Sequence, residues 1–241
     1  MRAPGKMLAL IPAKEGSTRL PCKNILPLAG KTMLDRTIAT AKKCGVFDRI
    51  FVSTESDKVA RIAAEAGLPP PFMRPAELSR DPAGVVDVCL HALAEFEGMG
   101  ESYETLVILL PTSPFRKTED VMGSIRTYCE SGVDFLMSVV REVHSPLSSL
   151  VLGDGQLKPL HPELLNQTGA RSLGKRLPYL VRANGAVTIV NVVSFKREQN
   201  YYAYPLGAYE MPVERSLDID TPLEFEFAQF LAQAHPDWLD E

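Results

Sequence analysis

Three cations stand within ten residues in the segment 11–24, which directly follows an apolar run near the N-terminus. The segment combines charge, hydroxyl groups and a glycine in one short stretch: Lys14, Gly16, Ser17, Thr18, Arg19 and Lys23. A triphosphate requires cations for its charge and backbone N–H groups in a turn that approaches it closely, which a glycine allows. The stretch is neither a P-loop nor a G-x-G-x-x-G fingerprint. It predicts a phosphate-binding loop, although a solvated basic loop would have a similar composition.

A second candidate site lies near the end of the chain, where Asp218, Ile219 and Asp220 alternate acid, apolar and acid. On an extended segment, both carboxylates point to one face and the isoleucine points to the other. Mg²⁺ prefers a few carboxylates together with waters and phosphates, so the pair predicts a site for Mg²⁺, or for Mn²⁺ in its place. The alternative is a helix cap, because Asp220 or Thr221 stands just before a proline that suits a first helical turn.

Short apolar runs that alternate with helical patterns must position these residues. Strands are expected at 7–11, 49–53, 106–110 and 134–140, and helices at 32–44, 58–66, 85–96 and 119–131. Such alternation predicts an α/β fold with a mainly parallel sheet and helices on both faces, which is a three-layer sandwich. Ligands of such sheets bind beyond the carboxyl ends of the strands, which directs attention to the loops after Ile11, Ser53 and Leu110.

The alternation breaks between Glu142 and Arg182, a stretch that contains four prolines. A loop of this length inside a compact domain needs a purpose. We expect it to pack on another subunit, with disorder as the alternative. The sheet is expected to resume at 186–193, and a final helix at 221–234. The chain is therefore expected to be a single domain over 1–241, with 142–182 as an insertion.

The composition narrows the classes of protein that this chain can belong to. A length of 241 residues with 45% hydrophobic residues suits one α/β domain, and a net charge of −4 argues against a broad nucleic-acid-binding surface. The longest apolar runs are too short to span a membrane or to form a signal sequence, so we expect a cytoplasmic protein without a membrane partner. The four cysteines form no C-x-x-C pair, which favours reduced thiols.

The cationic segment resembles the I-P-A-R-x-G-S-x-x-[IL]-P-x-K-N signature of the acylneuraminate cytidylyltransferases. This family includes the CMP-sialic acid, pseudaminic acid and legionaminic acid synthetases. Nine positions match: Ile11, Pro12, Ala13, Gly16, Ser17, Leu20, Pro21, Lys23 and Asn24. Five further segments resemble family motifs in the expected order: V-S-T-E-S-D at 52–57, R-P-A-E-L at 74–78, P-T-S-P-F-R at 111–116, N-G-A at 184–186 and L-D-I-D-T at 217–221. Together they span about residues 8 to 230.

The resemblance implies a fold, a reaction and a set of site residues. The implied fold is the Rossmann-like sandwich of nucleotide-diphospho-sugar transferases with a small dimerisation excursion, and the implied assembly is a homodimer. The implied reaction transfers CMP from CTP to the anomeric hydroxyl of a nonulosonic 2-keto sugar acid, depends on Mg²⁺ and releases pyrophosphate. The implied catalytic residues are Lys14, Lys23 and Asp220, and the implied metal ligands are Asp218 and Asp220.

The same resemblance implies how the substrates are divided over the site. The nucleotide would be bound by Ala13, Lys14, Gly16, Ser17, Arg19, Lys23, Asn24, Arg74 and Leu110. The sugar would be bound by Thr112, Arg176, Asn184 and Gly185. Arg176 belongs to a group of cations within 142–182 that suits a sugar carboxylate, although a solvated basic patch has the same composition. For Arg74, the alternative to nucleotide binding is an ion pair with Glu77 or Asp81.

Two departures from the family pattern keep other functions open. Lys14 stands where the family usually has arginine, and it loses the planar fork while it keeps the charge. Leu110 stands where several members have glutamine, and leucine makes no side-chain hydrogen bond. The alternatives are a nucleotidyltransferase of the same fold with another base or sugar, such as a GDP-sugar synthetase, and a non-catalytic nucleotide-binding relative. A dehydrogenase is disfavoured because no glycine fingerprint follows the first strand.

Overall fold

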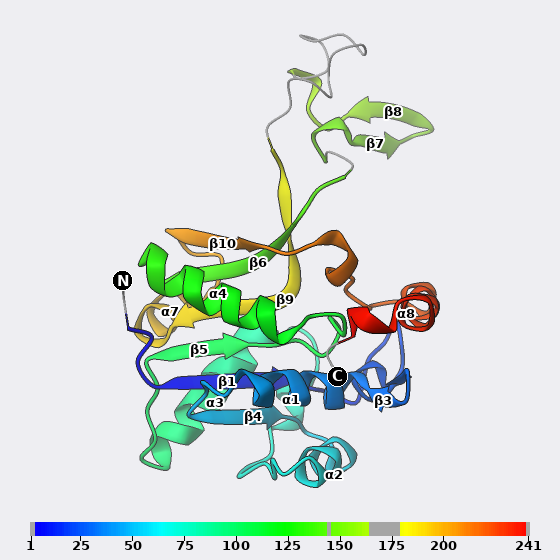
Figure 1. Cartoon of the computed structure of the whole chain (residues 1–241). Helices are drawn as coiled ribbons and strands as arrows, with labels where there is room; N and C mark the ends of the chain where they lie inside the picture. The colour runs from blue at the N-terminus through cyan, green and yellow to red at the C-terminus, as the bar shows by residue number, and fades with distance from the viewer. Residues whose placement is uncertain (1–2, 144–145, 164–178, 240–241) are drawn as a thin grey trace.

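A computed structural model gives the structure of the chain and describes residues 3–143, 146–163 and 179–239 (Figure 1). A six-stranded sheet in the order β10-β6-β9-β5-β1-β4 forms the centre. The strands are β1 (Met7–Pro12), β4 (Arg49–Ser53), β5 (Thr105–Ile108), β6 (Phe135–Arg141), β9 (Val181–Asn191) and β10 (Leu206–Glu210). β1 pairs in parallel with β4 and β5, and β10 pairs in parallel with β6. The predicted α/β fold with a mainly parallel sheet is confirmed.

β9 is the exception, because it runs antiparallel to both β5 and β6. The expected strand at 186–193 exists, but it begins at Val181 and ends at Asn191. An apolar run predicts a strand without its direction, which is set by the connection to the preceding strand. The chain leaves β6, passes through the excursion and returns beside β6 itself. A strand that returns beside its predecessor without a crossover is antiparallel to it.

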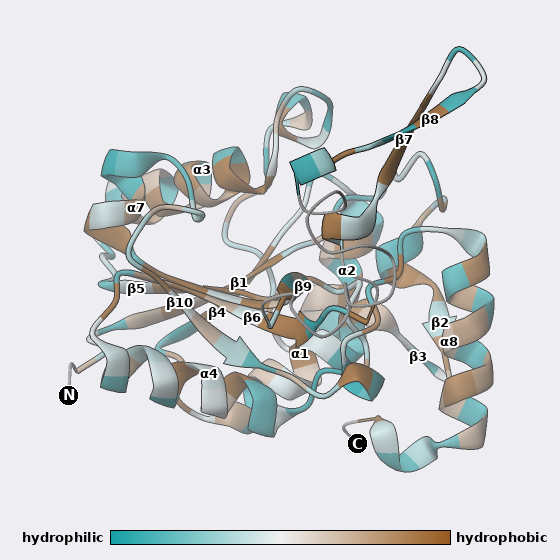
Figure 2. Cartoon of the chain, turned by 90° about the horizontal axis from the view of Figure 1, so that it is seen from above, coloured by the Kyte–Doolittle hydropathy of each residue, from teal (hydrophilic) through white to brown (hydrophobic). Residues whose placement is uncertain are grey.

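Helices cover both faces of the sheet, as the alternation predicts (Figure 2). α1 (Met33–Cys44), α2 (Asp57–Glu65) and α4 (Thr118–Ser131) pack on one face, and α3 (Val85–Gly98) and α7 (Val192–Glu198) pack on the other. The side chains of β1 divide between the two cores in strict alternation. Ala9 and Ile11 belong to the first core, and Leu8 and Leu10 belong to the second. A strand that is buried on both faces reads as a continuous apolar run, which is why this one was visible in the sequence.

Local capping signals fix the helix ends that position the site. Thr32 and Asp35 form a capping box at the start of α1, and Gly45 ends this helix in the left-handed region at φ 64°. The last helix, α8 (Pro222–Ala234), begins with a capping box between Thr221 and Glu224. Thr221, and not Asp220, therefore provides the side-chain cap that the sequence left open. The carboxylate of Asp220 is free for other contacts.

Several short elements have no counterpart among the expected ones. β2 (Pro27–Leu28) pairs with β3 (Lys31–Thr32) ahead of α1, and β10 and α7 complete the main body. Single turns of 3-10 helix occur at η1 (Lys23–Ile25), η2 (Ala76–Ser79), η3 (Pro146–Ser148), η4 (Val213–Arg215) and η5 (Pro236–Trp238). All four cysteines are free thiols. Within the described part of the chain, no helix is long and apolar enough to cross a membrane.

The excursion between β6 and β9 contains a hairpin of β7 (Leu150–Gly153) and β8 (Gln156–Pro159), which stands away from the main body (Figure 1). The whole hairpin was missed in the sequence because its short strands lie in a stretch that four prolines interrupt. Its large apolar side chains are exposed, with Leu152 at 72% and Leu157 at 62% of their full accessible surface. The role of 142–182 in dimerisation stays a prediction.

A buried ion pair fixes the segment that leads into the two late aspartates. Arg215 donates two hydrogen bonds to the carboxylate of Asp120 in the first turn of α4, from Nε at 2.9 Å and from Nη2 at 2.8 Å. The side chain of Asp120 is fully buried. Arg215 also pairs with Glu119 at 2.9 Å, but the Glu119 side chain is 62% exposed. The same guanidinium thus has one buried and one exposed acidic partner.

Asp120→Ala is expected to lower the free energy of unfolding by about 3 kcal/mol, because it leaves Arg215 partly buried without its main partner. Glu119→Ala is the matched control, and since its ion pair is exposed we expect a loss of less than about 1 kcal/mol. Urea denaturation followed by circular dichroism measures both values. Equal losses in the two variants would contradict the assignment of Asp120 as the structural partner.

Candidate functional site

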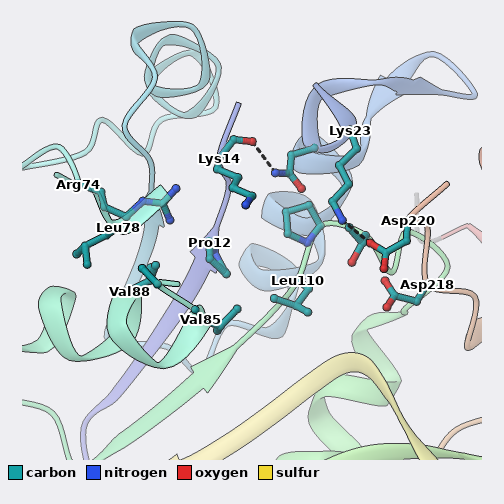
Figure 3. Close-up of a pocket in the computed structure, with 15 residues that line it drawn as sticks. Pro12, Lys14, Lys23, Arg74, Leu78, Val85, Val88, Leu110, Asp218 and Asp220 are labelled. Atoms are coloured by element: carbon teal, nitrogen blue, oxygen red, sulfur yellow. Dashed lines mark hydrogen bonds and ion pairs between the residues drawn. The ribbon is translucent and has the colours of Figure 1, made fainter. Parts of the chain in front are cut away.

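A pocket of about 300 Å³ opens beyond the carboxyl ends of β1 and β5 (Figure 3). This volume falls at the lower end of small-molecule sites, which cover roughly 300–1,000 Å³. Eight of the residues predicted for the site line it: Lys14, Lys23, Asn24, Arg74, Leu110, Thr112, Asp218 and Asp220. They come from four separate stretches of the chain. The carboxyl edge of the sheet brings them together, as expected for an open α/β sheet.

The pocket has two ends of different chemistry. Figure 3 shows Lys23, Asp218 and Asp220 at one end and Arg74, Leu78 and Val88 at the other, with Pro12 and Lys14 between them. The first end is charged. The second is largely apolar and is closed by residues that the sequence analysis did not assign to the site: Leu78, Ala83, Gly84, Val85 and Val88. An elongated ligand with a charged part and a flat, less polar part fits this division.

Ion pairs connect the cationic loop to the late aspartates. Lys23 Nζ lies 2.5 Å from Asp220 Oδ1, and Arg19 Nη2 lies 2.6 Å from Asp220 Oδ2. The Lys23 side chain is 19% exposed, whereas that of Arg19 is 65% exposed. Lys23 is therefore held at the pocket wall, and Arg19 forms a contact at the rim that costs little to break.

Asn24 holds the loop in this conformation. Its side chain is 4% exposed, and Nδ2 donates a hydrogen bond of 2.8 Å to the backbone carbonyl of Lys14. This bond closes the loop between Lys14 and Lys23. Asn24 therefore has a structural contact, beside the nucleotide contact that the family resemblance implies.

The remaining loop residues surround two further hollows, of about 110 and 490 Å³, beside this pocket. Ser17 and Arg19 share one of them with Lys14, Lys23 and Asp220, and Gly16 lines the other. Ala13 is fully buried, its N–H donates to the carbonyl of Ser53, and it lines none of these three hollows, so the structure does not bring it to the pocket with the other predicted residues. A Cβ atom built at Gly16 meets no atom within 4 Å in the described structure. The space that the glycine leaves is open to a ligand.

The acidic segment is clamped so that both carboxylates face the pocket. Ile219 is fully buried in a cluster with Leu28, Met33 and Ala228. Its N–H donates a hydrogen bond of 2.9 Å to the carbonyl of Thr112. Because Ile219 points into the core, the flanking acids point away from it, as the alternation of acid and apolar residues predicts.

The two acids differ in their protonation behaviour. Burial raises the pKa of the Asp218 carboxyl, against the effect of a hydrogen bond from the Thr112 hydroxyl. Burial acts on Asp220 as well, but the hydrogen bond and charge of Lys23, together with the charge of Arg19, hold its pKa below the ordinary value. Asp220 is therefore the more strongly ionised acid. Asp218 has the greater need for a positively charged partner.

The donor atoms fit a hard divalent cation that also binds phosphate. Asp218 Oδ1 is buried and has no hydrogen-bond partner among the described residues. A buried carboxylate oxygen without a partner is costly unless a ligand completes it. No group of three or more potential ligands of the His, Cys, Asp or Glu type occurs in the described parts of the chain. A metal held by two carboxylates must take its other ligands from water and substrate, which is the manner of Mg²⁺.

Of the residues predicted to bind the sugar, two border the pocket, one is buried inside the protein and one lies outside the described residues. Thr112 lines the pocket. Gly185 has φ 72°, and a Cβ atom there would lie 3.5 Å from both Asp218 Oδ2 and Leu110 Cδ1, so this glycine borders the pocket. Asn184 is 1% exposed, and its amide contacts Ser138, Ala186 and Ser216 inside the protein. Arg176 lies outside the described residues.

Leu110 gives the pocket an apolar wall. It lies two residues beyond the end of β5, whereas the sequence predicted that the strand would include it. Its carbonyl accepts a hydrogen bond of 3.0 Å from the buried Arg116, which also donates to the carbonyl of Ala186 at 2.7 Å. The leucine side chain is thus fixed at the pocket where several family members have glutamine.

Arg74 is paired, but with a residue that the sequence did not suggest. Its Nη2 lies 2.6 Å from Glu55 Oε2 at the end of β4, and neither Glu77 nor Asp81 forms an ion pair with it in the described structure. The sequence analysis did not assign the apolar residues of this pocket wall to the site, because apolar residues in a sequence are normally interpreted as part of the hydrophobic core. The R-P-A-E-L motif, which includes Leu78, was the one signal that pointed to this wall.

Comparison with known proteins identifies the family of the chain. A family model described as cytidylyltransferase matches residues 8–238. A CMP-N,N'-diacetyllegionaminic acid synthase from Legionella pneumophila is 28% identical over 236 residues, which cover 97% of this chain and 99% of that protein. An N-acylneuraminate cytidylyltransferase from Streptococcus agalactiae is 35% identical over 225 residues, which cover 91% of this chain and 52% of that protein. The chain spans about half the length of this second relative.

A solved structure gives the corresponding likeness in three dimensions. It is a CMP:2-keto-3-deoxy-manno-octonic acid synthetase complexed with CTP. The TM-score is 0.69 at 15% sequence identity, over 95% of this chain and 99% of that chain. At this identity the likeness shows a shared fold, including the mainly parallel sheet with helices on both faces.

Proposed function

The chain belongs to the cytidylyltransferase family and is a nucleotidyltransferase, and on that premise we propose that it transfers CMP from CTP to a nonulosonic 2-keto sugar acid. The observation that carries this proposal is the pocket itself. Lys23 and Arg19 from the first loop lie 2.5 and 2.6 Å from Asp220, about 200 residues later, next to an apolar end that suits a base. The names of the relatives support CMP as the transferred group and acidic sugars as acceptors.

The charged end of the pocket receives the triphosphate. Lys14, Lys23 and Arg19 surround the loop hollow, so a triphosphate placed there meets three cations. Lys23 and Arg19 pair with Asp220 in the structure. With a triphosphate bound, the two cations would pair with phosphate oxygens, and Asp220 would be released to join Asp218 as a ligand of the accompanying metal.

Asp218 and Asp220 hold the metal. When bound there, Mg²⁺ or Mn²⁺ neutralises phosphate charge and supplies Lewis acidity to the phosphate oxygens. The partnerless oxygen of Asp218 supports this assignment.

The chain's own residues position the reaction. The anomeric oxygen of the sugar forms a bond to the α-phosphorus, the bond between the α-phosphorus and the bridging oxygen breaks, and pyrophosphate leaves. The sugar hydroxyl loses its proton to solvent. Lys14 and Lys23 stabilise the negative charge that moves onto the leaving phosphates. Positioning and electrostatics are sufficient for such a transfer, and no covalent enzyme intermediate is required.

The other end of the pocket receives the base. Arg74 is 4% exposed and its charge is balanced by Glu55, so it acts as a directed hydrogen-bond donor rather than as a phosphate cation. Leu78, Val85 and Val88 provide apolar surface for a flat ring. Thr112 and Gly185 lie at Asp218 and border the sugar, while Leu110 belongs to the wall that borders the nucleotide. Both substrates are water-soluble anions, which suits a reaction in the cytoplasm.

The exposed hairpin supports a homodimer. A two-stranded sheet is marginally stable by itself, and exposed apolar side chains such as Leu152 and Leu157 gain by burial against another chain. We therefore propose that the β7–β8 hairpin packs on a second copy of the chain.

Pyrophosphate release with Mg²⁺, each of the four common NTPs and a panel of sugar acids tests the proposed reaction. We expect release with CTP and a nonulosonic acid and with no other pair. Release with GTP and another sugar would favour a GDP-sugar synthetase. Nucleotide binding without turnover for every pair would favour a non-catalytic relative.

Asp220→Ala is expected to reduce the turnover rate by roughly a hundredfold or more, because it removes one of two metal ligands. The same substitution leaves Lys23 and Arg19 without their acidic partner, so the circular dichroism spectrum should be recorded to verify the fold. Asp237→Ala, at an exposed aspartate near the end of the chain, is the control and should keep the wild-type rate. Wild-type turnover in Asp220→Ala would refute the assignment of the metal site.

The double substitution Leu152→Lys and Leu157→Lys is expected to produce a monomer, because burying two charged side chains in an apolar contact between chains is costly. Light scattering coupled to size-exclusion chromatography measures the mass in solution. Val193→Lys, at a site on α7 that is likewise 72% exposed, is the control and should keep the wild-type assembly. A wild-type chain that is monomeric at all concentrations would contradict the proposal.

A further inference from the structure

Glu55, at the carboxyl end of β4, connects three segments that border the pocket. Its Oε2 accepts hydrogen bonds from Arg74 Nη2 at 2.6 Å and from Ser79 Oγ at 2.7 Å. Its Oε1 accepts a hydrogen bond of 3.0 Å from the backbone N–H of Glu15 in the cationic loop. The Glu55 side chain is 17% exposed, so these bonds are largely shielded from water. One carboxylate thus serves the base end and the phosphate end of the pocket together.

Arg74 is held by this carboxylate in a single orientation. Its side chain is 3% exposed, and besides the contact with Glu55 its Nε donates to Ser79 Oγ at 3.1 Å. Its backbone N–H donates to the carbonyl of Thr54 at 2.8 Å. Two of the three guanidinium nitrogens are engaged in these bonds, while the residue still lines the pocket. A ligand in the pocket therefore meets a donor whose direction is already fixed, which reduces the ordering cost of binding.

The cationic loop is anchored by the same carboxylate on its other side. Glu15 follows Lys14, and its own carboxylate accepts a hydrogen bond of 2.5 Å from Ser56 Oγ, next to Glu55. The carbonyl of Lys14 is in turn held by Asn24. The backbone around Lys14 is thus fixed at two successive residues, once from η1 and once from the end of β4. Without the hydrogen bond from the Glu15 N–H to Glu55, Lys14 would keep its charge, but its backbone would no longer be held in one position.

We propose that Glu55 is a positioning residue, which sets the relative position of Arg74 and the cationic loop before the nucleotide binds. Several energetic features agree with this role. The burial of Glu55 acts to raise its pKa, but the hydrogen bonds from Ser79, Arg74 and the Glu15 backbone outweigh it and lower the pKa, so the carboxylate is ionised at neutral pH. Loss of this charge leaves the guanidinium of Arg74 buried and unpaired, which is costly.

The length of the side chain is part of the inference. The resembling family motif has aspartate where this chain has Glu55, and the additional methylene gives the carboxylate its reach between Arg74 and the Glu15 N–H. Glu55→Asp keeps the charge but shortens the reach. We expect it to keep one of the two contacts and to have an intermediate effect, whereas Glu55→Gln keeps the reach and loses the charge.

Hydrogen exchange of the ligand-free protein tests the inference without reference to any activity. In Glu55→Gln, amide exchange in the peptide that covers 13–20 is expected to become faster, because the neutral amide is a weaker acceptor for the Glu15 N–H. Glu101→Gln is the matched control. It removes the acid of another ion pair, with Arg49 at 2.7 Å, away from the pocket, and should leave this peptide unchanged.

Nucleotide affinity and kinetics provide the second test, which rests on the proposed function. For Glu55→Gln we expect the KM for CTP and the calorimetric Kd for CTP to rise by about tenfold, with a much smaller change in kcat. For Glu55→Asp we expect a rise of a few fold, and for Glu101→Gln no change. Ser79→Ala is a milder variant that weakens the same network, and it should shift the Kd in the same direction if Glu55→Gln fails to fold.

The outcomes separate the inference from the proposed function. Faster exchange of 13–20 together with a higher KM for CTP supports Glu55 as the positioning residue. Unchanged exchange in both Glu55→Gln and Ser79→Ala overturns it, as does a fall in kcat without any change in KM or Kd. If the wild-type chain binds no CTP, the proposed function fails, and the exchange experiment still decides the role of Glu55.

Discussion

The ion pair between Lys23 and Asp220 joins residues that are 197 positions apart in the chain, and the architecture of the site depends on it. Two carboxylates placed two residues apart repel each other, and so do three cations in one loop. Each group is acceptable at the end of a sheet because the other stands opposite to it. Lys23 and Arg19 balance the charge of Asp220, whereas Asp218 keeps a buried oxygen without a hydrogen-bond partner among the described residues. In the function that we propose, a metal-bound triphosphate would exchange partners with the first three residues and complete Asp218.

The framework around this pair is built to keep the acids in place. Ile219 is fixed in the core, its N–H is bonded to the Thr112 carbonyl, and Arg215 is bound to the buried Asp120 a few residues before it. The acid segment is thus attached on both sides and at its centre. On the opposite wall, Asn24 and Glu55 perform the same task for the cationic loop. Rigid supports of this kind explain how a loop and an extended segment can serve as a precise site.

Much of the fold was predictable because its signals are local. The first strand, the capped helix α1 and the helix α8 each carry their pattern or their caps within a few residues. The direction of β9 and the existence of β10 depend on connections between distant segments, which a local pattern does not contain. The β7–β8 hairpin lies in a stretch interrupted by prolines, where the alternation of strand and helix patterns is lost.

The site residues likewise fall into those that local sequence signals reveal and those that they do not. Charged and polar residues in motifs were found from the sequence, and the pocket collects Lys14, Lys23, Asp218 and Asp220 as expected. Its apolar wall was missed because Val85 and Val88 look like the buried face of a helix. The partner of Arg74 was missed because Glu55 lies 19 residues earlier, in the loop after β4. The burial of Asn184 could not be predicted, because the residue type does not tell whether an asparagine side chain is exposed or buried.

The cap of α8 has a consequence for anyone who reshapes this enzyme. The carboxylate of Glu224 accepts hydrogen bonds at 2.8 Å from the N–H groups of both Thr221 and Asp220. The backbone of Asp220, a metal ligand in the function that we propose, is therefore part of the helix cap, and it relies on the first turn of α8 being wound. A chain truncated within this helix would retain both Asp218 and Asp220 and yet lose the scaffold that aims one of them. Fusion partners attached after α8 should therefore be separated from it by a flexible spacer.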